Sequence, residues 1–234
     1  MSADEGLPIG TRAEMDTPPR TVMVVVAHAD DAEIAAGGTI ARLSDAGVRV
    51  VTAVLSLAET GPSAEQRIAD TERAAGLLGY ELRWPHGEPA LQVSDYGEVA
   101  LVATLDRLMT EIAPQTVLTH WRGDGHVDHA LTGRAVAAAL RNHRADLFSL
   151  RPAEPRTIAT SQFCPTVFVD ISDQFKRKAE ALEPFTRARP GFRPVDGAAV
   201  QLADRFHGQL SGTEYAEAFA LERQHGLGAA LPQG

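Results

Sequence analysis

Hydrophobic residues along the chain occur in two patterns, short continuous runs and helical spacings. Residues 22–27 are apolar at every position, which is typical of a strand buried on both faces of a sheet. In residues 97–112 the apolar positions recur every three or four residues and share one helix face: Leu101, Leu105, Leu108 and Ile112. Because runs and helical patterns alternate through most of the chain, we expect strands joined by helices.

Glycine and proline residues mark where several of these elements end. Strands are predicted over residues 22–27, 48–55, 80–84, 115–119, 157–160 and 166–171. Helices are predicted over residues 32–46, 63–78, 97–112, 129–142, 173–185 and 214–223, with Asp173 as the N-cap of the fifth. Residues 186–212 are rich in arginine, glycine and proline, and this composition predicts a loop.

The alternation of strands and helices predicts the fold class. We expect an α/β fold, a Rossmann-like, doubly wound, mostly parallel sheet with helices on both faces. A length of 234 residues suits one such domain, placed over residues 21–224. Residues 1–20 are polar and acidic, and they lack the apolar core of a signal peptide, so a disordered N-terminal tail is predicted. Residues 225–234 are expected to form a C-terminal tail.

Composition narrows the classes of partner and compartment. The formal charge of −9 disfavours a general nucleic-acid or anionic-membrane surface. No stretch reaches the roughly 20 apolar residues of a membrane span. The single cysteine, Cys164, excludes an internal disulfide, fits a reducing cytoplasm and is expected to be a buried, inert thiol. A homo-oligomer built through an apolar face of the final helix remains open.

The first candidate metal-binding or catalytic cluster directly follows the first predicted strand. It reads His28-Ala29-Asp30-Asp31-Ala32-Glu33, at the sheet edge where α/β proteins bind ligands. His28 and Asp31 are three residues apart, so one helical turn brings them to the same side as metal ligands. Asp30 then points elsewhere and is placed to take a proton from a metal-bound water. The alternative is a helix N-terminus at which acidic residues only complement the dipole.

A second cluster, His126-Val127-Asp128-His129, follows the strand predicted over residues 115–119. Histidine is a frequent metal ligand near neutral pH. His129 can complete a metal site with the His28 and Asp31 of the first cluster. His126 is then free to donate a proton or to stabilise an oxyanion, with Asp128 to orient it. The alternative is a surface loop that carries solvated histidines.

The glycines near the first cluster do not form the pattern of a dinucleotide-binding site. The first strand is not followed by Gly-x-Gly-x-x-Gly, so a dinucleotide-dependent oxidoreductase is disfavoured. We expect Gly37 and Gly38 to permit close packing of a neighbouring segment instead.

Both clusters resemble motifs of the PIG-L/LmbE-like zinc-dependent N-acetylglucosamine deacetylase family. Residues 24–40 are similar to its first motif, Ala-His-Pro-Asp-Asp-x-Glu, with Ala29 in place of the proline. Residues 119–129 are similar to its second motif, His-x-Asp-His. The segment from Arg67 to Asp70 is similar to an Arg-x-x-Glu helix, with aspartate in place of glutamate. The resemblance extends over roughly residues 22–222.

This resemblance implies a hydrolase that removes the N-acetyl group from an N-acetylated aminosugar or an intermediate containing one. It implies Zn²⁺ held by His28, Asp31 and His129, with Fe²⁺ or another divalent metal as the alternative in the cell. Asp30 is the implied general base. His126, with Asp128 behind it, is implied to protonate the leaving amine or to stabilise the oxyanion.

Two further residues are expected to contact the small-molecule substrate. The resemblance implies this role for Arg67, and His120 begins the loop of the second cluster, where a packing role is equally open. Two alternative functions also remain open at this point. One is an amidase that cleaves a larger acyl group from an aminosugar conjugate, and the other is a non-catalytic metal- or sugar-binding protein.

Overall fold

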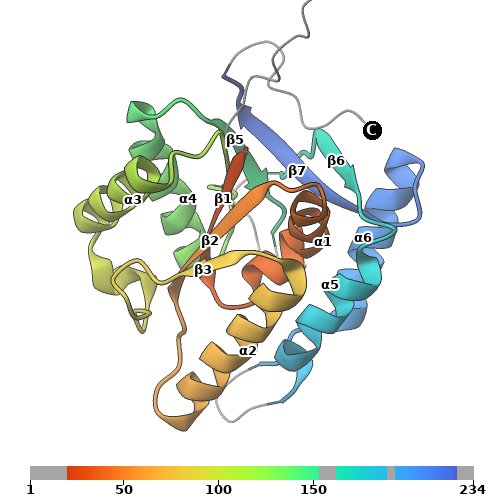
Figure 1. The fold of residues 1–234 in the computed structure, drawn as a ribbon, viewed down its shortest axis with the longest axis horizontal. Coiled ribbons are helices and arrows are strands. Elements are labelled where there is room, and N and C mark those ends of the chain that lie inside the picture. The colour runs from red at the N-terminus through yellow and green to blue at the C-terminus, as the bar shows by residue number, and fades with distance from the viewer. Residues whose placement is uncertain (1–19, 153–161, 189–192, 226–234) are drawn as a thin grey trace, which may run out of the picture.

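A computed structural model describes residues 20–152, 162–188 and 193–225, which form one seven-stranded sheet with helices on both faces (Figure 1). The strands are β1 (Thr21–His28), β2 (Arg49–Ser56), β3 (Glu81–Arg83), β4 (Thr116–His120), β5 (Asp146–Leu150), β6 (Val167–Asp170) and β7 (Ala216–Arg223). The α-helices are α1 (Asp31–Asp45), α2 (Pro62–Leu78), α3 (Glu98–Ile112), α4 (Val127–Ala139), α5 (Phe175–Leu182) and α6 (Gly197–Ser211). Short 3₁₀ turns are η1 (Val93–Tyr96), η2 (Leu140–Asn142) and η3 (Glu183–Thr186).

The strand order is β3-β2-β1-β4-β5-β7-β6. Strands β1 to β5 are parallel, and β7 runs antiparallel between β5 and β6. The predicted fold class, an α/β fold with a mostly parallel sheet and helices on both faces, is confirmed. In this order β1 and β4 are neighbours, and the chain runs outward from β1 towards β3 and from β4 towards β5. A crevice at the carboxyl ends of such strands is where open α/β sheets bind ligands.

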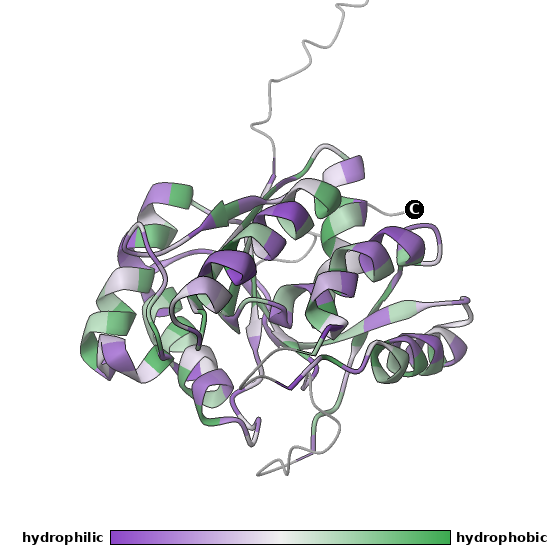
Figure 2. Cartoon of the chain, turned by 90° about the horizontal axis from the view of Figure 1, so that it is seen from below, coloured by the Kyte–Doolittle hydropathy of each residue, from purple (hydrophilic) through white to green (hydrophobic). Residues whose placement is uncertain are grey.

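The continuous apolar run of β1 is explained by two separate cores. Val22, Val24 and Val26 belong to the core on the side of α1, α2, α5 and α6. Met23, Val25 and Ala27 belong to the core on the side of α3 and α4. Because successive side chains of a strand point to opposite faces, only an uninterrupted apolar sequence can fill both cores. The helices carry alternating hydrophilic and hydrophobic bands, as expected where one face packs on the sheet (Figure 2).

Helix α1 is packed unusually closely against neighbouring segments. A Cβ atom on Gly38 would lie 2.7 Å from three side-chain atoms of Ile171, and one on Gly37 would lie 3.2 Å from Cγ of Lys178. The backbone N–H groups of Gly38 and Thr39 donate to the carboxylate of Glu217 at 2.9 and 2.7 Å. The expectation that Gly37 and Gly38 permit close packing is therefore confirmed.

A buried cluster of charged side chains joins α1 to β7 and to the helices α5 and α6. The ammonium of Lys178 donates to Asp204 at 2.6 Å and to Glu217 at 2.7 Å, and these three side chains are almost fully buried. The guanidinium of Arg151 donates to the carbonyl of Ile34 in α1. These contacts fix α1, whose first residues carry candidate chemistry, to α5, α6 and β7.

The C-terminal third departs most from the sequence predictions. The helix predicted over 214–223 is wrong, because residues 216–223 form β7, which pairs with strands on both sides. The loop predicted over 186–212 is wrong, because α6 lies within it, begun by the Asp196 side chain, which accepts from Ala199 N–H, and ended by left-handed Gly212. Strand β5 was not predicted. The strand predicted over 157–160 lies outside the described residues.

Smaller differences concern α5 and the cysteine. Helix α5 ends at Leu182 and continues as η3, and its N-cap is Gln174 rather than Asp173. Cys164 is exposed, so the prediction of a buried thiol is wrong. Both predicted tails fall almost wholly outside the described residues. Within the described part of the chain, the helices are all too short or too polar to cross a membrane.

Candidate metal centre and active site

Acidic and histidine side chains gather at the carboxyl ends of the neighbouring strands β1 and β4 and at the starts of the helices α1 and α4. His28 ends β1, Asp30 and Asp31 lie at the start of α1, and His120 ends β4. His129 lies in the first turn of α4. Parallel pairing of β1 with β2 and β4 brings these strand ends to one edge of the sheet, so residues about one hundred positions apart become neighbours.

The two oxygens of Asp31 face the two predicted histidine ligands. His28 Nδ1 lies 3.4 Å from Asp31 Oδ2, and His129 Nε2 lies 3.3 Å from Asp31 Oδ1. Around a tetrahedral zinc with bonds of roughly 2.0–2.1 Å, neighbouring donor atoms are about 3.3 Å apart. The backbone N–H of His28 also donates to Asp31 Oδ2 at 2.8 Å, which fixes the carboxylate. These donor types fit a divalent metal, although His28 and His129 face different oxygens of Asp31.

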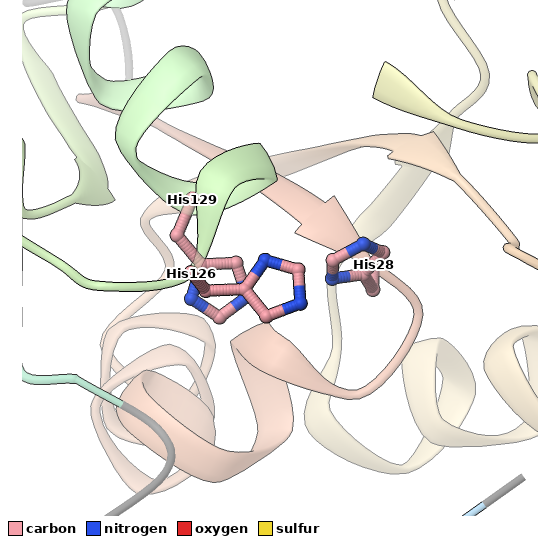
Figure 3. A group of neighbouring side chains, drawn as sticks. All are labelled: His28, His126 and His129. Atoms are coloured by element: carbon pink, nitrogen blue, oxygen red, sulfur yellow. The ribbon is translucent and has the colours of Figure 1, made fainter. Parts of the chain in front are cut away.

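Donor atoms converge in two overlapping groups, and in each group they lie within 4.8 Å of one another. One group is His28, His126 and His129, whose rings point toward one another in Figure 3. The other is Asp31, His120 and His129, all buried. The predicted trio of His28, Asp31 and His129 is therefore divided between the two groups, with His129 common to both.

Two outer carboxylates orient the histidines. Asp124 Oδ2 lies 2.9 Å from His129 Nδ1, and Asp128 Oδ2 lies 3.1 Å from His28 Nε2. With these nitrogens engaged, the remaining nitrogen of each ring faces Asp31, an arrangement that raises the basicity of metal-binding imidazoles. Asp128 was expected to orient His126, whereas the structure pairs it with His28. His126 is exposed and stacks on His129, with ring centroids 4.3 Å apart.

Asp124, just before the His-x-Asp-His motif, is a site residue that the sequence did not predict. Its Oδ1 accepts from the backbone N–H of His126 at 2.9 Å, so one buried carboxylate both shapes the turn and holds His129. An aspartate two residues before a histidine cluster is a recognisable turn signal. The sequence alone does not show that its second oxygen reaches His129.

The electrostatics of this cluster favour positive charge. Burial lowers the pKa of His28, but contacts with Asp128 and Asp31 outweigh burial and raise the pKa to about 9. Burial also lowers the pKa of His129, but the charge of Asp31 and the hydrogen bond with Asp124 raise it to about 10. Without a metal the carboxylates are thus balanced by imidazolium groups, and a dication can replace those protons.

Asp30 stands apart from both donor groups. It is the N-cap of α1 with φ 155 and ψ −21, a conformation that a non-glycine residue rarely adopts. Its Oδ2 lies 3.0 Å from a terminal nitrogen of Arg67. Burial raises the pKa of Asp30 to about 6, against the lowering effect of Arg67. A carboxylate with this pKa beside a metal site is suited to accept a proton near neutral pH.

Arg67, on α2, is held by a second carboxylate that the sequence analysis did not find. Its Nε lies 3.3 Å from Glu59 Oε1, and its guanidinium lies 5.0 Å from the ring centroid of Phe185. Glu59 comes from the loop between β2 and α2 and also accepts from the Ser63 hydroxyl. The Arg67 side chain is 5% exposed. It therefore acts on the site chiefly through Asp30.

His120 lies behind Asp31 and His129. Its Nε2 accepts from the backbone N–H of Ala27 at 3.0 Å and lies 3.2 Å from Asp31 Oδ2. Its ring stacks on His129 with centroids 3.9 Å apart, and burial lowers its pKa to about 4. The side chain is 3% exposed, so the geometry favours the packing role over substrate contact.

Comparison with known proteins gives this arrangement a family context. Residues 23–140, half of the chain, match the family PIG-L, GlcNAc-PI de-N-acetylase. The chain is 28% identical over 183 residues to a probable N-acetyl-alpha-D-glucosaminyl L-malate deacetylase 2 of Bacillus cereus, covering 70% of this chain and 81% of that protein. It is 27% identical over 226 residues to the diacetylchitobiose deacetylase of Thermococcus kodakarensis, covering 85% and 81%.

The fold is also shared with an enzyme of a different reaction class. The crystal structure of GalB, the 4-carboxy-2-hydroxymuconate hydratase of Pseudomonas putida, superposes with a TM-score of 0.68 at 18% identity, covering 91% of this chain and 100% of that one. This likeness concerns the fold alone. The family match covers both clusters, from the end of β1 to the first turns of α4, and the chain belongs to the PIG-L, GlcNAc-PI de-N-acetylase family.

Proposed function

We propose that this chain is a metal-dependent hydrolase that removes the N-acetyl group from an N-acetylated aminosugar. One observation carries the proposal: two histidines, each oriented by an outer carboxylate, face Asp31, while Asp30 stays outside both donor groups. The relatives named as deacetylases of N-acetylglucosaminyl malate and of diacetylchitobiose support the substrate class. We assign Zn²⁺ to His28, Asp31 and His129, with Fe²⁺ as the alternative.

A bound zinc ion would lower the pKa of a water ligand and polarise the acetyl carbonyl. The protein residues then handle the protons. Asp30 accepts a proton from the attacking water, because one of its oxygens is fixed by Arg67 and its pKa of about 6 leaves it ionised at neutral pH. His126, exposed at the rim, donates a proton to the leaving amine nitrogen as the C–N bond breaks. Asp128 and Asp124 keep the rings of His28 and His129 in place.

The test is acetate release from a panel of N-acetylglucosamine derivatives by the zinc-loaded protein. The panel contains the free sugar, a nucleotide-linked sugar, an inositol-linked sugar and a disaccharide. Equimolar acetate and amine from at least one member are expected. Hydration of an unsaturated acid, the reaction named for GalB, would release neither product, because no amide is broken. Bound zinc with no acetate from any member would contradict the proposal. It would favour the amidase for larger acyl groups or the non-catalytic binding protein.

A further inference from the structure

We propose that the outward face of α6 is the contact surface of a homodimer, in which the α6 helices of two copies pack antiparallel across a two-fold axis near Phe206. Three residues of α6 form this surface, and we call them the α6 stripe: Leu202, Phe206 and Leu210. Helix α6 lies at the edge of the molecule, beside α5 and β7 (Figure 1). The stripe shares no residue with the metal centre, so the dimer does not depend on the proposed chemistry.

The two faces of α6 have the reverse of the usual polarity. A surface helix normally turns its apolar side chains towards the core and its polar ones to water. The buried positions of α6 are Val200, Asp204 and Gly208, and only the first of them has a large apolar side chain. The α6 stripe follows two residues later at each point, about 200° around the helix. Its three side chains, from Leu202 to Leu210, are 70%, 59% and 57% exposed.

Buried contacts prevent α6 from rotating to hide the stripe. Asp204 accepts from the ammonium of Lys178 at 2.6 Å, and both side chains are almost fully buried. A rotation of the helix would separate this pair and leave a buried charge without its partner, which is strongly unfavourable. A Cβ atom on Gly208 would lie 2.6 Å from the carbonyl oxygen of Glu214, so the inward face also packs too closely to accept a larger residue. The apolar face is therefore held outward.

The residues around the stripe have the composition of a protein–protein interface. Within α6, all of whose residues the structure describes, Arg205 is the one exposed charged residue, although the chain has a formal charge of −9. The centres of interfaces are likewise depleted of charge, with aromatic residues and arginine enriched. Other large apolar side chains that are exposed in the described part of the chain lie singly on different elements: Leu91, Val99, Val127 and Leu221. Single exposed apolar residues are common, whereas a continuous row marks a contact surface.

The order of side chains along the stripe favours a second copy of this chain as the partner. Leucine, phenylalanine and leucine at intervals of four residues are symmetric about Phe206. An antiparallel α6 therefore places Phe206 against Phe206 of the partner subunit, and Leu202 against Leu210 of the partner subunit. A two-fold axis requires a surface that is complementary to itself in this way.

The size of α6 determines how strong the contact can be. A helix of 15 residues is about 22 Å long and about 10 Å wide, so it offers roughly 220 Å² to a partner. A standard interface buries about 800 Å² on each partner. The stripe therefore predicts a weak, concentration-dependent dimer with a dissociation constant of about 1–100 μM. An area of this size suits one facing helix better than a large globular partner.

Sedimentation over a range of concentrations tests the contact in wild type, Phe206→Glu and Val99→Glu. Val99 is 85% exposed on α3, so its substitution adds the same charge at an exposed apolar position outside α6. We expect wild type to change from monomer to dimer between about 1 and 500 μM. Phe206→Glu should raise the dissociation constant at least about 100-fold, because it occurs twice at the centre of the dimer, and Val99→Glu should leave it unchanged. Thermal unfolding confirms that the variants fold, and Leu210→Glu replaces Phe206→Glu if the latter does not.

Disulfide cross-linking tests the antiparallel arrangement. The single, exposed cysteine is first removed by Cys164→Ser, and Leu202→Cys and Leu210→Cys are then made separately in this background. Antiparallel helices bring position 202 next to position 210 of the partner subunit, whereas two copies of position 202 lie about 12 Å apart along the helix axis, too far for a disulfide. Under mild oxidation the mixture of the two variants should therefore form a covalent dimer at least about tenfold faster than either variant alone.

Three results would overturn the proposed dimer. The first is a wild type that stays monomeric up to about 500 μM, which would leave the stripe to solvent or to a different protein. The second is an assembly of any size that Phe206→Glu leaves intact, because its interface would then lie elsewhere. The third is cross-linking of Leu202→Cys alone as fast as in the mixture, which would exclude the antiparallel arrangement. Acetate release enters none of these measurements, so they hold whether or not the proposed function does.

Discussion

At the scale of single residues, the site is built from carboxylates with separate tasks. Asp31 faces the two histidines proposed as metal ligands, Asp124 and Asp128 contact the other nitrogens of their rings, and Asp30 is turned away towards Arg67. Two adjacent aspartates can differ in this way because Asp30 is the N-cap of α1, whereas Asp31 is its first residue. The unusual φ of Asp30 directs the two side chains apart.

Glu33 is a buried carboxyl beside this site, and it makes stability depend on pH. It is 1% exposed and accepts from the Tyr80 hydroxyl at 2.7 Å. Burial raises its pKa from 4.5 to about 7, so the folded protein favours the protonated form. The stabilisation that comes with the raised pKa of Glu33 is fully present below pH 4.5, the pKa of the unfolded chain. It is lost as the pH rises through 7. The loss is on the order of 3 kcal/mol.

Glu33→Gln should therefore gain stability relative to wild type as the pH rises from 5 to 9, because glutamine keeps an acceptor for Tyr80 and never ionises. Urea unfolding of the metal-free proteins at several pH values measures the difference in free energy of unfolding. Glu65→Gln, at an exposed position, should show no such trend. A Glu33→Gln difference that is constant across this pH range would contradict the assignment.

At the scale of elements, the position of α1 depends on the C-terminal part of the chain. Glu217 of β7 accepts two backbone N–H groups in the middle of α1, and Lys178 of α5 lies over Gly37. Lys178 and Glu217 are in turn joined by a buried ion pair. Since α1 begins with Asp31, these distant contacts also fix the carboxylate that we propose as a metal ligand.

Gly38→Ala tests this close packing. Alanine is a better helix former by about 1 kcal/mol, but its Cβ would lie 2.7 Å from Ile171, so we expect a net destabilisation of about 1–3 kcal/mol. Gly76→Ala is the matched control on α2, where an added Cβ meets nothing within 4 Å and should raise stability slightly. Thermal and urea unfolding compare the two variants. Equal gains in stability would show that the contact between α1 and Ile171 is loose.

At the scale of the whole molecule, the sequence predicts those helices and strands whose hydrophobic pattern is evident within the segment itself. The apolar run of β1 shows burial on both faces, and each motif directly follows its strand. Strand β7 was not predictable in this way, because its Ala- and Glu-rich sequence favours a helix until pairing with β5 and β6 decides otherwise. Glu59 was missed for a similar reason: its role depends on Arg67, which only the packing of α2 brings near.

We propose Asp30 as the base and Asp31 as a metal ligand, although the two residues are adjacent. The most direct measurement compares zinc content and acetate release in wild type, Asp30→Asn and Asp31→Asn, using a substrate that the wild type hydrolyses. Asp30→Asn should keep its zinc and lose at least about 100-fold in kcat, the usual contribution of a general base. Asp31→Asn should lose zinc and activity together. Acetate release at the wild-type rate by Asp30→Asn, or loss of its zinc, would contradict the account.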